Sequence, residues 1–179
     1  MRDVIGFTHS ILKTILEEND VVIDATAGNG HDTLFLAQNV AQVHALDIQE
    51  EALKRTRERL DENNLTNVTL HRQGHEHLES LDTPPPKAVI FNLGYLPGGD
   101  PSITTKRLTS LEAIKQALKK VLPSGMVAIT LYPGHPEGKE EAGLIESYLA
   151  SLSTKHFTVL KYQIVNTDHS PYSLIVKKH

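Results

Sequence analysis

A glycine turn that begins with an acidic residue follows the first apolar run of the chain. Residues 24–32 read Asp-Ala-Thr-Ala-Gly-Asn-Gly-His-Asp, which places Gly28 and Gly30 at alternate positions. Such glycines let the backbone turn tightly and come close to a ligand, since they carry no Cβ. A dinucleotide site would have a third glycine where Thr33 stands, and Asp24 would repel a pyrophosphate but suit an amino-acid ammonium group. The turn therefore predicts an S-adenosylmethionine site rather than an NAD site, with a plain strand-to-helix turn as the alternative. The predicted cofactor-binding residues of the turn are Asp24, Gly28, Gly30 and Asp32.

Two further positions would complete a nucleoside site. Asp47 ends the second apolar run, where a carboxylate can accept hydrogen bonds from both ribose hydroxyls. Its alternative role is to cap the helix that is predicted to start near residue 49. Gly74 and His75 follow the third apolar run, where contacts to adenine normally arise, and the His75 ring could pack on the base or hydrogen-bond to its edge. Because the chain has ten histidines, only its position singles out His75.

A polar turn with an aromatic residue ends the fourth apolar run. Residues 92–97 read Asn-Leu-Gly-Tyr-Leu-Pro, which is similar to the Asn-Pro-Pro-Tyr signature of methyltransferases that modify amino groups. In such an enzyme, acceptors for the N–H groups of the substrate amine would aim the nitrogen lone pair at the methyl group of S-adenosylmethionine. The Asn92 side-chain oxygen and the Leu93 carbonyl can supply those acceptors, with Tyr95 as a flat wall. These three residues are the predicted catalytic group, and a plain loop is the alternative. A dry pocket beside a cationic sulfonium would lower the pKa of the amine, so a dedicated base is not required.

Charged and aromatic residues in the following loops are expected to form the rim of the pocket. Lys106, Arg107 and Lys139 could contact phosphates, and Tyr132 or His135 could hold a base. Loop charges are usually just solvated, which is the alternative for each of these residues. The predicted substrate-binding residues are Asp100, Lys106, Arg107, Tyr132 and His135.

These loops are predicted to lie at one edge of a sheet, because strand-like and helix-like apolar patterns alternate along the chain. Strands are predicted over residues 21–25, 42–47, 68–71, 87–92, 126–131, 157–165 and 173–176, and helices over 8–16, 32–37, 50–63, 109–122 and 140–152. The alternation predicts an α/β fold, a seven-stranded mostly parallel sheet with helices on both faces. Ligands of such sheets bind at the carboxyl ends of the strands, so the loops after the first four strands should meet in space.

Composition limits the remaining possibilities. The 179 residues have room for one domain, taken as residues 1–179, and 39% hydrophobic with 22% charged residues is a globular balance. The chain has no cysteine, which excludes disulfides, thiolate zinc sites and cysteine nucleophiles. No metal is predicted, since the alternating His71, His75 and His77 have no acidic cluster beside them. A net charge of -4 argues against nonspecific coating of nucleic acid, and without an apolar run long enough to span a membrane the expected location is cytoplasmic.

Four segments carry a family resemblance, residues 24–33, 92–100, 103–106 and 132–135. Together they resemble the bacterial tRNA 5-(aminomethyl)-2-thiouridine methyltransferases, long labelled rRNA methylases, over nearly the whole chain. The resemblance implies a Rossmann-like class I methyltransferase fold, S-adenosylmethionine as donor and the anticodon stem-loop of tRNA as substrate, with a wobble 5-aminomethyl-2-thiouridine converted to its 5-methylaminomethyl form. It also implies cofactor contacts by Asn29, Asp47, Gln49, Gly74 and His75. Ala27 and the proline-rich loop 132–139 depart from the family pattern, and the second departure leaves the substrate details open.

Two other functions remain open from the sequence. The same donor could serve an rRNA base or a small amine, or the chain could bind S-adenosylmethionine as a scaffold without catalysis. Since no RNA-binding domain is appended, tRNA would have to bind the rim of the catalytic domain. A second subunit could extend that rim, which makes a homodimer a further hypothesis.

Overall fold

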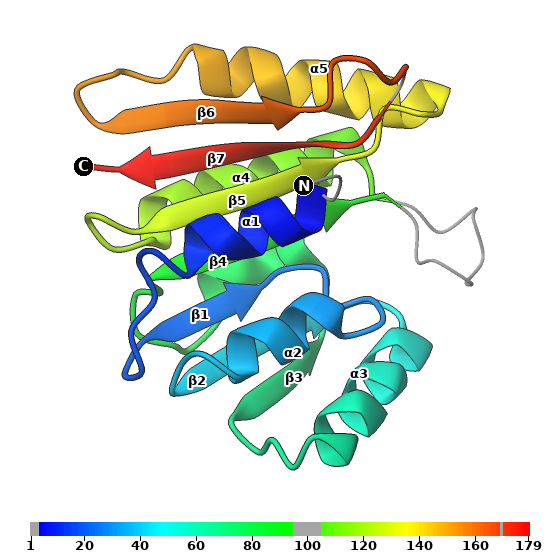
Figure 1. Ribbon diagram of the computed structural model, residues 1–179, viewed down its shortest axis with the longest axis vertical. Helices are drawn as coiled ribbons and strands as arrows, with labels where there is room; N and C mark the ends of the chain where they lie inside the picture. The colour runs from blue at the N-terminus through cyan, green and yellow to red at the C-terminus, as the bar shows by residue number, and fades with distance from the viewer. Residues whose placement is uncertain (1–3, 95–104, 169) are drawn as a thin grey trace.

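The computed structural model describes residues 4–94, 105–168 and 170–179, and it shows a seven-stranded sheet with helices on both faces (Figure 1). The helices and strands in chain order are α1 (Val4–Leu12), β1 (Val21–Asp24), α2 (His31–Ala37), β2 (Gln42–Asp47), α3 (Glu50–Glu62), β3 (Val68–Arg72), η1 (His75–Ser80), β4 (Ala88–Leu93), α4 (Arg107–Lys120), β5 (Met126–Leu131), α5 (Pro136–Ala150), β6 (Phe157–Gln163) and β7 (Tyr172–Lys178). Within the described part of the chain, no helix combines the length and the apolar character needed to cross a membrane.

The sheet is parallel except at one edge. Its strand order is β3-β2-β1-β4-β5-β7-β6, and β7 runs antiparallel to both β5 and β6. β1 pairs with β2 on one side and with β4 on the other, so the order of strands reverses between β1 and β4. The carboxyl ends of the parallel strands lie at the same edge, and a crevice forms where the order reverses. The loops after β1, β2 and β3 therefore meet there with the carboxyl end of β4, as the alternation of elements predicts.

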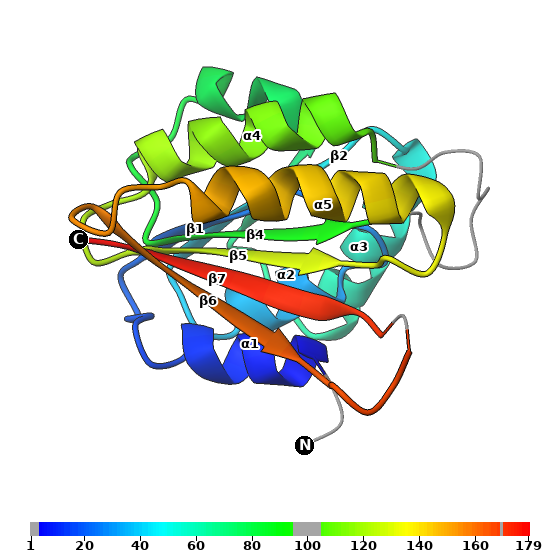
Figure 2. The same cartoon turned by 90° about the horizontal axis from the view of Figure 1, so that it is seen from above.

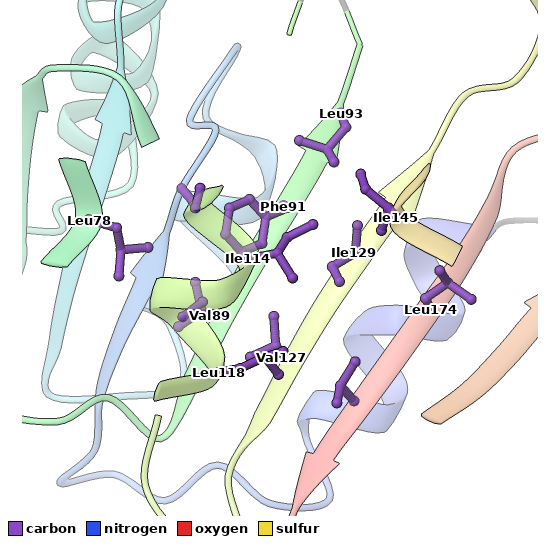
Figure 3. Packing of buried hydrophobic residues seen from close by; sticks show 14 of the residues in the cluster. Leu78, Val89, Phe91, Leu93, Ile114, Leu118, Val127, Ile129, Ile145 and Leu174 are labelled. Carbon is purple, nitrogen blue, oxygen red and sulfur yellow. The ribbon is translucent and has the colours of Figure 1, made fainter. Parts of the chain in front are cut away.

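Two hydrophobic layers cover the sheet, because alternate side chains of each strand point to opposite faces. On one face, Val89 and Phe91 of β4 pack with residues of α4 and α5, as Figure 3 shows. On the other face, Ala88 and Ile90 of β4 pack with residues of α1, α2 and α3. Figure 2 shows α4 and α5 on one side of the strands and α1 on the other. Asn92 follows the alternation of Ala88 and Ile90, so its side chain is directed toward α1 and α2.

The first helix lies earlier in the chain than its predicted range of 8–16. Val4, Thr8 and Leu12 are buried at a spacing of four residues, so the periodic face extends back to Val4. After Leu12 the chain continues in turns, in which the Ile15 N–H bonds to the Leu12 carbonyl at 3.0 Å. Ile15 still packs on the core, and for this reason its apolar character extended the predicted helix too far.

The last helix and the segment after β3 also differ from the predicted elements. α5 begins at Pro136 rather than at residue 140, because a proline fits the first helical turn and His135 Nδ1 accepts the Gly138 N–H at 3.1 Å. Proline and glycine at these positions looked like a loop in the sequence. The short helix η1 was not predicted, and it places His75 at its first position.

Candidate functional site

A cavity of about 1110 Å³ opens at the carboxyl edge of the sheet. The loops after β1, β2, β3 and β5 line it, together with the carboxyl end of β4 and the starts of α2, α4 and α5. The predicted site residues on its wall are Gly28, Asn29, Asp32, Asp47, Gln49, Gly74, His75, Asn92, Lys106, Tyr132 and His135. Small-molecule pockets usually enclose about 300–1,000 Å³, so this one has room for a substrate group beside a cofactor.

The turn between β1 and α2 depends on its two glycines. Gly28 and Gly30 have left-handed backbone conformations, with φ values of 53° and 77°. A Cβ on Gly30 would lie 2.9 Å from the Thr56 Cα, so α3 closes tightly against the turn. The Thr56 hydroxyl also donates to the Gly28 carbonyl at 3.2 Å. Gly30 therefore shapes the turn through its backbone, and it does not itself line the cavity.

Asp24 lies beneath this turn instead of on the cavity wall. Its side chain is fully buried, where it accepts the Thr33 hydroxyl at 2.6 Å and the Thr26 N–H at 3.1 Å. Burial, followed by the nearby charge of Asp32, raises the pKa of Asp24 to about 7. Because Asp24 shares the face of β1 that carries Val22, it is directed at α2. This position does not support the predicted contact with an ammonium group, and Asp24 ties the turn to α2 instead.

Asp47 ends β2 with both carboxylate oxygens bonded to backbone N–H groups. Oδ2 accepts the Gly28 N–H and Oδ1 accepts the Gln49 N–H, each at 2.9 Å. Burial raises the pKa of Asp47, and these backbone hydrogen bonds oppose the rise. Asn29 is fixed beside it, since Arg59 donates to the Asn29 carbonyl at 2.8 Å. Each carboxylate oxygen has a further lone pair, so Asp47 can also accept two ligand hydroxyls.

His75 and Ile48 give the wall a flat and an apolar surface. The His75 ring meets Phe91 edge-on with centroids 6.1 Å apart, and its Nε2 lies 3.5 Å from the Ser110 hydroxyl. Burial lowers the pKa of His75, which favours the neutral form of its ring. Ile48 follows Asp47 directly and is 56% exposed on the cavity wall. A planar base can pack against such surfaces.

Asn92 is the polar residue of β4 that reaches the cavity. Its backbone N–H donates to Thr26 Oγ1 at 2.7 Å, and its Nδ2 donates to Asp32 Oδ2. Its Oδ1 is buried and has no hydrogen-bond partner among the described residues. A buried polar atom without a partner costs about 1–3 kcal/mol, so a hydrogen bond from a ligand that reaches Oδ1 would be favourable.

Of the other two predicted catalytic residues, the structure describes only Leu93. The Leu93 side chain is buried in the core next to its β5 partner Leu131, and Leu93 does not line the cavity. Tyr95 lies outside the described residues, as does Asp100 of the predicted substrate group. Their predicted roles stay predictions.

The predicted basic residues at the start of α4 separate into two positions. Lys106 lines the cavity together with Tyr132 and His135 of the loop after β5. Arg107 does not line it, and its guanidinium pairs with Glu140 at 2.6 Å on the exposed surface. The rim position predicted for both residues therefore holds for Lys106 alone.

Ile48, His9 and Glu141 are among the residues at the site that were not predicted. Ile48 had a visible signal, an apolar residue directly after an acidic strand end. His9 approaches Asp32 to 2.5 Å, and Glu141 accepts from Ser110 at 2.7 Å; both partners lie far along the chain, so no local pattern marked them. Burial raises the pKa of Glu141. Through its bond to Ser110, Glu141 supports the α4 side of the cavity.

The histidines whose alternation was considered for metal binding have other partners. His71 Nε2 lies 3.0 Å from His44 Nδ1, and burial lowers the pKa of both rings. Among the residues that the structure describes, no three His, Asp or Glu side chains form a group that could hold a metal ion. His71 therefore belongs to the packing between β2 and β3.

Comparisons with known proteins agree with this fold. A family model described as "Putative rRNA methylase" matches residues 43–178. A chloroplastic tRNA (mnm(5)s(2)U34)-methyltransferase from Arabidopsis thaliana is 33% identical over an alignment of 187 positions, which covers 95% of this chain and 67% of that protein. Two solved structures are similar over 100% of this chain and 99% of their own. One is described as "a putative methyltransferase" from Streptococcus mutans in complex with S-adenosylhomocysteine (SAH; 38% identity, TM-score 0.93), and the other as a "putative rRNA-methylase" from Clostridium thermocellum (35% identity, TM-score 0.97). The chain belongs to this rRNA methylase family of S-adenosylmethionine-dependent methyltransferases.

Proposed function

We propose that this protein methylates the amino group of 5-aminomethyl-(2-thio)uridine at the wobble position of tRNA, which gives 5-methylaminomethyl-(2-thio)uridine. The observation that carries the proposal is Asn92 Oδ1, a buried acceptor without a described partner on the same cavity wall as Asp47. The name of the Arabidopsis relative, a tRNA (mnm(5)s(2)U34)-methyltransferase, supports the choice of substrate.

The cofactor side of the cavity fits S-adenosylmethionine. Asp47 has lone pairs for two ribose hydroxyls, and the His75 ring and the exposed Ile48 side chain offer surfaces for adenine. Gly28 brings the backbone of the turn to the cavity without a Cβ. When bound, this cofactor supplies an electrophilic methyl group. Gln49 and Gly74 line the same side and complete the proposed contacts.

The acceptor side would orient the amine of the substrate. Asn92 Oδ1 accepts one N–H of the aminomethyl group and thereby fixes the direction of the nitrogen lone pair. The Leu93 carbonyl remains the proposed second acceptor. Burial in the cavity disfavours the charged ammonium form and lowers the pKa of the amine, so the nucleophilic neutral form is available without a dedicated base.

The tRNA would contact the rim of the cavity. Lys106 is exposed there, and Tyr132 and His135 line the same opening. Because the net charge of the chain is -4, attraction to phosphates has to be local. We also propose that the protein forms a homodimer that extends the rim. The proposal further includes one catalytic domain over residues 1–179 and a cytoplasmic location.

Nucleoside mass spectrometry tests this function. Purified protein and methyl-labelled donor, incubated with tRNA from a strain that lacks the gene, should convert the wobble aminomethyl group to the methylaminomethyl group. Parallel incubations with rRNA and with small amines test the alternative substrates, and label found only in those samples would refute the tRNA assignment. Donor binding without turnover on any acceptor would identify a scaffold instead.

A further inference from the structure

A series of hydrogen-bonded side chains connects α1 to Asn92, whose Oδ1 is the proposed acceptor. His9 Nε2 lies 2.5 Å from Asp32 Oδ1, and Asn92 Nδ2 donates to Asp32 Oδ2, so each carboxylate oxygen has one partner among the residues that the structure describes. We propose that His9 and Asp32 are positioning residues, which hold the Asn92 carboxamide with Oδ1 toward the cavity. This inference rests on the proposed function, in which Oδ1 accepts an N–H of the substrate. It gives Asp32 a different role from the predicted cofactor contact.

The carboxylate of Asp32 determines the orientation of the amide. An ionised carboxylate only accepts hydrogen bonds, whereas a carboxamide donates at one end and accepts at the other. If the Asn92 amide were rotated by half a turn, its Oδ1 would face an Asp32 oxygen, and two acceptors would be in contact. The Nδ2 group would then be directed to the cavity, where it could not accept an N–H. Asp32 therefore selects the orientation that methyl transfer to an amine requires.

His9 fixes the carboxylate in turn. Its Nε2 donates to one Asp32 oxygen and leaves the other for the amide, and its ring stacks on Phe35 of α2 with centroids 3.8 Å apart and planes 3° apart. α1 is itself anchored to the sheet, because the buried Thr8 hydroxyl lies 2.8 Å from Ser173 Oγ on β7. The two helices that meet at Asp32 are thus held on the face of β4 that carries Asn92.

A matched pair of variants separates hydrogen bonding from packing. His9→Phe keeps a ring for the stack on Phe35 and removes the donor to Asp32, whereas His9→Gln restores a donor at nearly the same reach. His9→Phe should lower kcat about 10-fold, with a calorimetric Kd for SAH that stays within about twofold of wild type, and His9→Gln should recover most of the loss. Ser10→Ala is the control, since this exposed hydroxyl bonds the Gly6 carbonyl of its own helix, and it should leave kcat unchanged.

The Asn92 side-chain amide reports the orientation without any methyl acceptor. In nitrogen-15 NMR spectra of the SAH-bound protein, one Nδ2 proton should be shifted downfield by its bond to the carboxylate. Asp32→Ala and His9→Phe should lose that shift, and His9→Gln should keep it. The proposal is overturned if Asp32→Ala leaves the shift unchanged, or if His9→Gln folds, binds SAH and loses as much kcat as His9→Phe. A wild-type protein that shows the shift but does not methylate tRNA would refute the proposed function alone.

Discussion

The two sides of the cavity are held in different ways. On the cofactor side, the Asp47 carboxylate is fixed by two backbone N–H groups, and the turn itself depends on the backbone conformation of Gly28. On the acceptor side, side chains fix one another, from His9 through Asp32 to Asn92. Cofactor binding and methyl transfer should therefore respond to different substitutions.

Asn92→Ala should reduce turnover more than any other single change on the acceptor side. Without Oδ1 the amine is no longer aimed, and kcat should fall on the order of 100-fold while the Kd of SAH changes little. Single-turnover kinetics with tRNA and calorimetry with SAH measure the two quantities. Equal losses in both would place Asn92 among the cofactor contacts and contradict the separation.

Asp47→Ala should have the opposite signature. Loss of its charge-assisted hydrogen bonds to a ribose should weaken cofactor binding by about 1–3 kcal/mol, since the carboxylate is partly buried. Calorimetry with SAH measures the change. Asp47→Asn keeps one acceptor oxygen and should lose less, and an unchanged Kd in Asp47→Ala would reject the ribose contact.

Two glycine substitutions separate the turn from an ordinary helix position. Gly30→Ala should lower the free energy of unfolding by about 1–3 kcal/mol, because the φ of 77° is left-handed and the new Cβ would meet the Thr56 Cα at 2.9 Å. Gly143→Ala on α5 is the matched control, since its Cβ would meet nothing within 4 Å, and it should stabilise by up to about 1 kcal/mol. Denaturant unfolding measures both. A Gly30→Ala protein as stable as wild type would show that α3 does not close on the turn.

Asp24→Asn tests the buried support of the turn through pH. The folded pKa of about 7 exceeds the unfolded value of 3.8, so between these values the folded state keeps a proton that the unfolded state loses. Stability from this group falls as pH rises through that window, by at most about 1.4 kcal/mol per pH unit. The variant should therefore gain stability relative to wild type as pH rises from about 5 to about 7. Parallel stability curves for the two proteins would show that Asp24 is ionised throughout.

Three histidines with lowered pKa values change the stability with pH in the opposite direction to Asp24, and comparing Asp24→Asn with wild type removes their contribution. Burial lowers the pKa values of His44, His71 and His75, so below their unfolded value of 6.5 the unfolded chain takes up protons first. Stability from these groups falls as pH decreases. They are present in both proteins, so their contribution cancels in the difference between Asp24→Asn and wild type.

The smallest expected effect distinguishes two adjacent basic residues. Lys106 lines the cavity, whereas Arg107 pairs with Glu140 away from it. Lys106→Ala should raise the KM for tRNA and reduce the salt dependence of binding by a slope of about 1, and Arg107→Ala should change both less. Identical effects of the two variants would mean that the rim does not direct RNA to the cavity.

The strands and their functional ends could be predicted because they are local features. Asp47 and Asn92 each follow an apolar run, and parallel strands bring such ends to one edge. Asp24 was predicted at the same edge, but the face to which it points depends on which helix covers β1. That information lies in the packing of the whole sheet.

The support of Asn92 could not be predicted from sequence patterns. His9 and Asp32 are 23 residues apart, and their contact requires α1 and α2 to pack on the same face of β4. The predicted end of the first helix was wrong for a related reason. Ile15 is an apolar residue that packs on the core, although it lies beyond the end of α1 at Leu12.

A crystal structure of the SAH-bound protein would show whether the two sides of the cavity hold cofactor and acceptor as we infer. We expect ribose hydroxyls hydrogen-bonded to Asp47 and a sulfur that faces Asn92 Oδ1 across the cavity. SAH bound with its ribose away from Asp47, or with its sulfur turned away from Asn92, would contradict it.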